Sequence, residues 1–165
     1  MKKIIMVTGG QRSGKSMFAE RMAKALSDQP VYMATAHVED EEFRERVRIH
    51  QARRGAEWTT IEEERFLSLH MVEGRVVLVD CCTLWLTNFF SDASPLTEIE
   101  AEFDRLTAQD ATFLFVTNEI GLGGTSVNVV QRRFTDMLGA FNQYVANRAD
   151  EVYLLVSGIP MKIKG

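Results

Sequence analysis

The chain has 165 residues, 45% of them hydrophobic and 25% charged, and a formal net charge of −4. A chain of this length and composition is expected to form one domain with a substantial core, spanning residues 1–165. Its acidic balance argues against a nucleic-acid partner, and it has neither an apolar run of transmembrane length nor a secretory signal. Cys81 and Cys82 are adjacent, which excludes a disulfide framework and a CxxC metal site. We therefore expect a cytoplasmic protein without nucleic-acid partners or stable membrane insertion.

A glycine-rich loop joins the first predicted strand, residues 3–8, to an amphipathic helix pattern over residues 17–26. The loop sequence GGQRSGKS matches the phosphate-binding P-loop, G-x-x-x-x-G-K-[ST], for which the alternative is a glycine-rich turn that binds nothing. We expect the loop amides and the helix N-terminus to bind nucleotide phosphates, with Lys15 reaching the β- and γ-phosphates and Ser16 binding Mg²⁺. The predicted phosphate-binding residues are Gly9, Gly10, Gln11, Arg12, Ser13, Gly14, Lys15 and Ser16.

Two further predicted strands end in residues that suit a nucleotide site. Residues 31–35 predict a strand whose end, ATA at 34–36, is small enough to lie close to a ligand, although a plain exit from the sheet fits as well. Residues 75–80 form an apolar run that ends at Asp80, the Walker B pattern, in which the carboxylate orients the metal or its water. Many strands end in aspartate, but behind a P-loop the metal-side role is favoured.

A cationic helix is predicted over residues 39–54, with an acidic start and a basic end that suit the helix dipole. Phe43, Val47 and His50 share one face of this helix by their spacing. Its arginines either form an ordinary solvated face or receive phosphates beside a reactive imidazole. These arginines are Arg44, Arg46, Arg48, Arg53 and Arg54.

The remaining segments alternate between helix and strand patterns. A glycine-rich stretch, residues 118–126, follows a strong strand at the position where ligands bind in open α/β sheets, although a mobile connection fits the same pattern. The alternation predicts an α/β fold with a mostly parallel central sheet and helices on both faces. The expected helices are 66–70, 83–90, 96–108 and 127–149, and the expected strands are 58–61, 111–117, 151–156 and a short edge strand at 159–164.

Several of these segments together resemble one family, the bifunctional adenosylcobinamide kinase/adenosylcobinamide-phosphate guanylyltransferases of cobalamin biosynthesis. The matching segments keep the family's order and span nearly the whole chain. The P-loop is generic, whereas the His50 segment and the loop that begins at Asn118 are specific to the family. The matching segments are TGGQRSGKS (8–16), YMATA (32–36), RVRIHQARR (46–54), WTTIE (58–62), DCCTLWLTN (80–88), NEIGLG (118–123), RRFTD (132–136), GAFNQ (139–143), ADEV (149–152) and SGIP (157–160).

The resemblance implies two reactions, a RecA-like P-loop NTPase fold and a homotrimer. The family first phosphorylates the aminopropanol hydroxyl of adenosylcobinamide with ATP or GTP. It then transfers GMP from GTP, through a guanylylated histidine, to adenosylcobinamide phosphate, giving adenosylcobinamide-GDP. By family position His50 is the modified histidine, and Lys15 is the second catalytic residue. The implied cofactors are GTP, ATP and Mg²⁺.

The resemblance also implies a guanine nucleotide site made largely by the His50 segment. Arg53 and Arg54 are expected to hold developing negative charge. A carboxylate such as Glu62 accepts hydrogen bonds from guanine N1 and N2, which adenine does not offer. Ser16 and Asp80 are the predicted metal ligands. Besides the P-loop, the predicted nucleotide-binding residues are Ala34, Thr35, Ala36, Gln51, Ala52, Arg53, Arg54, Glu62 and Asp80.

Two positions depart from the family pattern. Gly55 stands where the family usually has proline, and the loop at 124–126 reads GTS where the family continues toward a proline. The second departure bears on how the corrinoid is held. Two other functions remain open: a simple small-molecule kinase in which His50 is idle, and a RecA-like nucleic-acid ATPase or nucleotide sensor.

Overall fold

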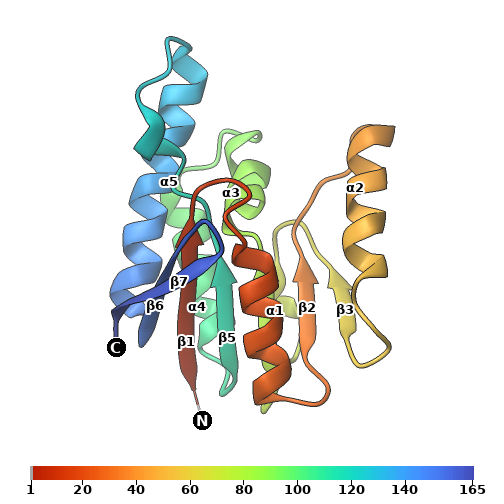
Figure 1. Ribbon diagram of the computed structural model, residues 1–165. Helices are drawn as coiled ribbons and strands as arrows, with labels where there is room; N and C mark the ends of the chain where they lie inside the picture. The colour runs from red at the N-terminus through yellow and green to blue at the C-terminus, as the bar shows by residue number, and fades with distance from the viewer. Residues whose placement is uncertain (1) are drawn as a thin grey trace.

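The computed structural model describes residues 2–165, and its strands form one seven-stranded sheet in the order β3-β2-β4-β5-β1-β6-β7 (Figure 1). All neighbouring strands are parallel except β7, which runs antiparallel to β6. Strand β5 lies between β1 and β4, which is the strand arrangement of RecA-like P-loop NTPases, so the predicted fold class is confirmed. The strands are β1 Lys3–Gly9, β2 Val31–Ala34, β3 Thr59–Glu62, β4 Val76–Asp80, β5 Thr112–Val116, β6 Glu151–Val156 and β7 Ile159–Lys164.

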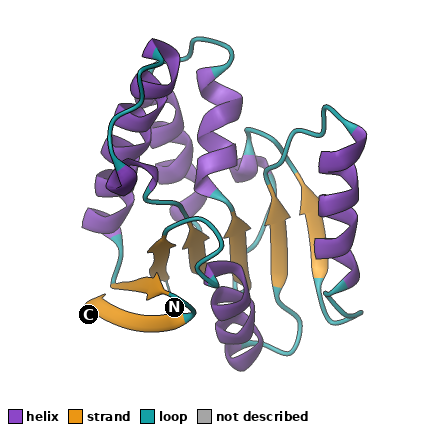
Figure 2. Cartoon of the chain, turned by 45° about the horizontal axis from the view of Figure 1, so that its top comes forward, coloured by secondary structure: helices purple, strands orange, loops and turns teal. Residues whose placement is uncertain are grey.

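Helices cover both faces of the sheet. One face is covered by α1, which contacts β1, β4 and β5, while α3, α4 and α5 pack together on the other face (Figure 1). Helix α2 stands beside the β3 edge, and the β6–β7 hairpin closes the opposite edge (Figure 2). The helices are α1 Lys15–Leu26, α2 Glu41–Ala52, α3 Cys82–Phe90, α4 Leu96–Thr107 and α5 Val129–Arg148, with 3₁₀ turns η1 Leu67–Leu69 and η2 Ile120–Gly123.

The core has two layers because the strands are apolar on both faces. On one face, Ile5 and Val7 pack against Ala19 of α1, whose small side chain lets the helix lie close to the sheet. On the other face, Ile4 and Met6 belong to a larger cluster built from strands and α3–α5. Its largest fully buried side chains are Trp85, Phe103, Phe113, Phe115 and Phe141. No helix among residues 2–165 has the length and apolar character needed to cross a membrane.

The predicted elements are confirmed with one exception, the helix expected over residues 66–70. Only the 3₁₀ turn η1 forms there. A side-chain oxygen of Glu63 accepts hydrogen bonds from the amides of Arg65 and Phe66, and Glu102 accepts one from the amide of Ser68. These carboxylates cap the amides at the start of the turn, but the backbone is already extended at His70 (φ −94°, ψ 126°), so only a single turn forms.

Candidate nucleotide and phosphoryl-transfer site

The P-loop connects β1 to α1 at the carboxyl edge of the sheet. Gly9 and Gly14 both have positive φ, +154° and +92°, and a Cβ at Gly9 would come within 2.6 Å of the Leu155 carbonyl oxygen. The turn between β6 and β7 braces the loop from the side, since the amide of Gly158 donates to the Ser13 carbonyl at 2.8 Å. Glycine is therefore required at position 9 by the close approach of β6, and at positions 9 and 14 by the positive φ.

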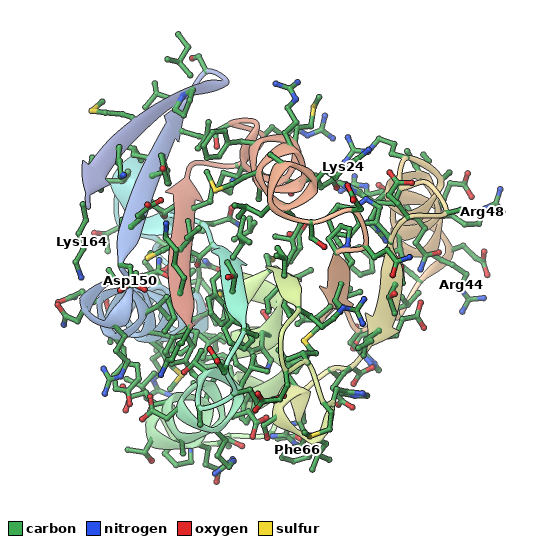
Figure 3. All side chains as sticks on the ribbon, turned by 90° about the horizontal axis from the view of Figure 1, so that it is seen from below. Lys24, Arg44, Arg48, Phe66, Asp150 and Lys164 are labelled. Carbon is green, nitrogen blue, oxygen red and sulfur yellow. The ribbon has the colours of Figure 1, made fainter. Side chains whose placement is uncertain are left out.

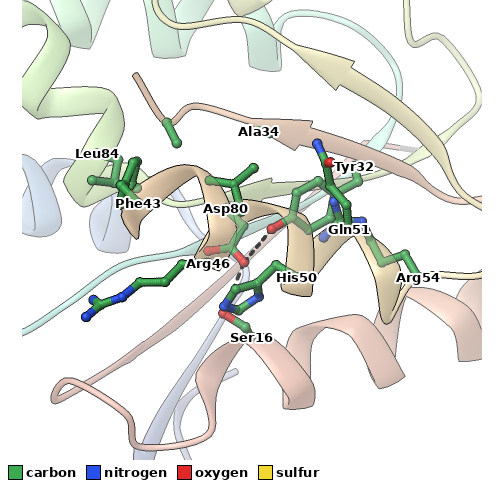
Figure 4. A pocket seen from close by; sticks show the side chains of 12 residues that line it. Ser16, Tyr32, Ala34, Phe43, Arg46, His50, Gln51, Arg54, Asp80 and Leu84 are labelled. Atoms are coloured by element: carbon green, nitrogen blue, oxygen red, sulfur yellow. Dashed lines mark hydrogen bonds between the residues drawn. The ribbon is translucent and has the colours of Figure 1, made fainter. Parts of the chain in front are cut away.

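Lys15, Ser16 and Asp80 make the polar centre of the site. Lys15 is only 7% exposed, and its Nζ donates to the Gly10 carbonyl oxygen. Burial lowers the pKa of Lys15, so the charged ammonium is poorly solvated until an anion reaches it. Ser16 Oγ donates to Asp80 Oδ2 at 3.0 Å, drawn as a dashed line in Figure 4.

The donor set around Ser16 suits Mg²⁺. Residues 2–165 contain no group of three or more histidine, cysteine or acidic side chains able to hold a metal by themselves. Mg²⁺ usually takes one or two protein oxygens and completes its octahedron with water and substrate phosphates. The hydroxyl of Ser16 and the carboxylate of Asp80 match that requirement.

Two cavities meet at His50. The larger, about 620 Å³, lies over the P-loop and is lined by Lys15, Ile49 and Arg53 among others. The smaller, about 220 Å³, has mainly apolar walls. Ser16, Arg46 and His50 line both, so the imidazole stands at the junction between the phosphate cradle and the apolar cavity (Figure 4). The other residues lining the smaller cavity are Tyr32, Ala34, Ala36, Phe43, Val47, Gln51, Arg54, Asp80 and Leu84.

Helix α2 carries His50 and has no buried residue. It begins at Glu41 because Asp40 Oδ1 accepts a hydrogen bond from the amide of Phe43 and caps the helix. Arg44 and Arg48 point away from the body of the protein, as Figure 3 shows from below, and pair with glutamates of the same helix. Arg46 also pairs with a glutamate of this helix, Glu42, but like Arg53 and Arg54 it lines a cavity.

Comparison with known proteins agrees with this arrangement. The family model for cobinamide kinase/cobinamide phosphate guanyltransferase matches residues 5–163. The chain belongs to this family. It is 39% identical to the bifunctional adenosylcobalamin biosynthesis protein CobP of Pseudomonas aeruginosa, with 97% of this chain and 96% of that protein covered. It is 35% identical to CobU of Escherichia coli, described by the same words, over 98% of this chain and 99% of that protein.

A solved structure with low sequence identity shares the fold. The flagellar accessory protein FlaH from Methanocaldococcus jannaschii superposes with a TM-score of 0.53 at 14% identity. The match covers 98% of this chain and 78% of the FlaH chain. This likeness shows that the two chains share an overall fold.

In this family member, His50 is held from the side by Arg53. Arg53 Nη2 donates to His50 Nδ1 at 2.9 Å. Because a guanidinium only donates, Nδ1 must carry the lone pair and Nε2 the ring proton. The same Nη2 lies 3.8 Å from Glu20 Oε1, a buried oxygen with no hydrogen-bond donor among the described residues. Burial raises the pKa of Glu20, against the opposing effect of Arg53.

A second arginine is stacked on a buried tyrosine. The guanidinium of Arg54 lies 3.5 Å from the centre of the Tyr32 ring, and Tyr32 donates its hydroxyl proton to Asp80 Oδ2 at 2.8 Å (Figure 4). Burial and the neighbouring Asp80 charge raise the pKa of Tyr32 well above its usual range, so it stays a donor. Arg54 Nε and Nη1 are buried without a partner among residues 2–165. These two donors call for an acceptor on a bound ligand.

Some residues that the sequence predicts for the nucleotide site lie outside the two cavities. Thr35 is fully buried, and its hydroxyl binds the backbone of Cys81. Ala52 is exposed at the end of α2. Glu62 ends the edge strand β3 and accepts a hydrogen bond from Gln51 at 2.9 Å, so it lies next to the smaller cavity without lining it. The nucleotide contacts of these three residues stay predictions.

Sequence reasoning missed two residues that the structure brings to the site, Tyr32 and Glu20. A signal was present for each. Tyr32 alternates with Ala34 on one face of the same strand, and Glu20 follows Ser16 by four residues on α1, which puts both on one helix face. The sequence does not predict the partner of either residue, because Asp80, which binds Tyr32, and Arg53, which lies near Glu20, come from distant parts of the chain.

Proposed function

We propose that this chain is a bifunctional enzyme that phosphorylates adenosylcobinamide with ATP or GTP and then transfers GMP from GTP to adenosylcobinamide phosphate. The observation that carries the proposal is the place of His50, which lines both the P-loop cavity and the apolar cavity beside it. An imidazole at this junction can reach the α-phosphorus of a triphosphate whose outer phosphates lie on the P-loop.

The guanylylation step follows from the tautomer that Arg53 selects. The lone pair on His50 Nδ1 attacks the α-phosphorus of GTP, the N–P bond forms and the bond to the β-phosphate oxygen breaks. Pyrophosphate leaves with the electron pair toward Lys15. Ser16 and Asp80 would hold a Mg²⁺ ion, which would offset the negative charge of the phosphates. Arg53 must first release Nδ1, and both Glu20 and the phosphates offer its guanidinium another acceptor.

We further propose that the nucleoside occupies the smaller cavity. Its walls include Phe43, Val47 and Leu84, and its volume of about 220 Å³ suits a purine. The unpartnered donors of Arg54 face an acceptor there, and Glu62 at the cavity's border is the proposed partner for guanine N1 and N2. The proposed nucleotide-binding set otherwise remains the P-loop, residues 34–36 and residues 51–54.

We also propose that residues 1–165 act as one domain and that the protein works as a cytoplasmic homotrimer, as the family resemblance implies. Strand β7 supports a subunit contact, because Ile159, Met161 and Ile163 alternate along the edge strand and are 70%, 54% and 55% exposed. An apolar edge strand left in water invites pairing with another chain. No nucleic acid takes part in this proposal.

The test is mass spectrometry of the intact protein after incubation with GTP and Mg²⁺. The expected product is one acid-labile GMP per chain on His50, absent from His50→Ala and formed normally in the exposed control Arg44→Ala. A GMP adduct retained in His50→Ala overturns the assignment. Phosphorylation of cobinamide without any adduct on the native protein would instead identify a simple kinase, and DNA-stimulated hydrolysis a nucleic-acid ATPase.

A further inference from the structure

A second carboxylate, Glu119, lies at the P-loop and has no place in the guanylylation chemistry. It follows β5, the strand between β1 and β4. Val116, three residues earlier, pairs with Val7 of β1 and with Asp80 of β4. The chain therefore leaves β5 level with the start of the P-loop and with the Walker B carboxylate.

Two hydrogen bonds tie Glu119 to the base of the P-loop. Its amide donates to the Gly9 carbonyl at 3.0 Å, and its Oε1 accepts the hydroxyl proton of Thr8 at 2.8 Å. The preceding residue is also fixed, since Asn118 accepts a hydrogen bond from the buried side chain of Asn142 at 2.9 Å. The carboxylate is thus oriented by backbone and side chain together.

The other oxygen of Glu119, Oε2, accepts no hydrogen bond from any residue in the range 2–165. The side chain is half-buried and lines a cavity of about 110 Å³ beneath the glycine-rich loop. Asp80, the only other carboxylate directly at the end of β1, β4 or β5 in the described chain, accepts from Ser16 and Tyr32 with Oδ2, and it is the carboxylate proposed to hold Mg²⁺ together with Ser16. Glu119 is the one of the two that has a free oxygen and no proposed role at the metal, so it is available to take a proton.

We propose that Glu119 is the general base of the kinase reaction, an inference that rests on the proposed function. The hydroxyl of the acceptor gives its proton to Glu119 Oε2 as its oxygen forms a bond to the γ-phosphorus. The bond from the γ-phosphorus to the β-phosphate oxygen breaks, and the nucleoside diphosphate leaves with the electron pair. The protonated carboxyl then returns its proton to solvent.

The surface around Glu119 suits a large, partly apolar acceptor. The loop that follows it exposes Leu122 and Val127, which are 78% and 97% exposed. His50 comes from α2, beside the β3 edge, whereas the segment that carries Glu119 leads from β5 into η2, which contacts α5 on the sheet face away from α1. The two reactions would then use opposite flanks of one P-loop.

The decisive variant is Glu119→Gln, because the amide oxygen still accepts the Thr8 hydroxyl while the base is lost. We expect cobinamide phosphorylation to fall by about 10²-fold or more, and the yield and rate of the His50–GMP adduct from GTP to stay within about threefold of the native protein. The acid limb of the kinase pH–rate profile should disappear in the variant, which a merely structural role would not cause.

Two further variants serve as comparisons for Glu119→Gln. Thr8→Val removes the orienting hydroxyl but leaves the base, so its kinase rate should fall by about tenfold or less. Glu98→Gln, on the exposed start of α4, should change neither reaction. Kinase turnover of Glu119→Gln within threefold of native, or an equal loss of both reactions, overturns the inference; a native protein that forms no GMP adduct and phosphorylates nothing overturns the proposed function itself.

Discussion

The two flanks of the P-loop are built in opposite ways. On one flank, α2 carries His50 and buries none of its residues. On the other, Asn118, the neighbour of Glu119, accepts a hydrogen bond from α5, which buries Leu138, Phe141, Asn142 and Val145 in or beside the larger core layer. A helix with so few buried contacts opens locally at low free energy, while one packed into the core opens only with much of the domain.

This difference matches the work each flank is proposed to do. A histidine that takes GMP from one substrate and passes it to another must contact two substrates in turn, so mobility of the helix that carries it is an advantage. A base must hold one oxygen within hydrogen-bond reach of one hydroxyl, so a fixed support is an advantage. The site thus places its proposed nucleophile on a weakly held helix and its proposed base on a firmly held segment.

The largest expected effect is in amide hydrogen exchange. In the nucleotide-free protein, amides of α2 should exchange at least about a hundredfold faster than those of residues 138–145 in α5, because only the latter are held by the core. Addition of GTP and Mg²⁺ should slow exchange in α2 as Arg46 and Arg53 meet phosphates. Equal protection of the two helices would show that the flanks do not differ in this way.

A pair of amide-to-alanine changes compares the two supports directly. Asn142 accepts from Thr117 at 2.6 Å and donates to Asn118, both inside the protein, whereas Gln51 makes an exposed hydrogen bond to Glu62. Asn142→Ala should lower the free energy of unfolding by about 2 kcal/mol because it strands the buried Thr117 hydroxyl, and Gln51→Ala by less than about 0.5 kcal/mol. Urea denaturation measures both, and similar losses would contradict the comparison.

The smallest effect is expected at the foot of the P-loop strand, away from both flanks. Lys3 donates to Glu151 at 2.8 Å and joins β1 to β6. This hydrogen bond lowers the pKa of Glu151 below its ordinary value of 4.5, so the folded state binds that proton less readily than the unfolded state. The pair therefore stabilises the fold above the ordinary pKa, and the stabilisation is lost as the pH falls through the lowered value.

Glu151→Gln tests that contribution. It should cost about 0.5 kcal/mol at pH 7, a small amount because the lysine is partly in water, and less near pH 3, because acid protonates the native carboxyl and removes its charge. Thermal unfolding of both proteins at the two pH values measures the difference. A cost that stays the same at low pH would mean that charge is not its source.

The fold was largely readable from the chain because its signals are local. A P-loop is eight consecutive residues, Asp80 ends its own apolar run, and strand and helix periods are visible within a dozen residues. The segment at 66–70 shows the limit. Its apolar spacing predicts a helix, but only one turn forms before the backbone becomes extended at His70, and Glu102, whose carboxylate binds the amide of Ser68 in that turn, comes from a distant helix.

The chemistry of the site depends on contacts that no local pattern contains. The hydrogen bond between Thr8 and Glu119 joins residues 111 positions apart in the sequence, and the one between Tyr32 and Asp80 joins residues 48 positions apart. The linear order of residues specified the P-loop, the strand that ends at Asp80 and the family to which the chain belongs. Only the parallel sheet, by bringing the carboxyl ends of β1, β2, β4 and β5 to one edge, decided which oxygens are already occupied and which are free to react.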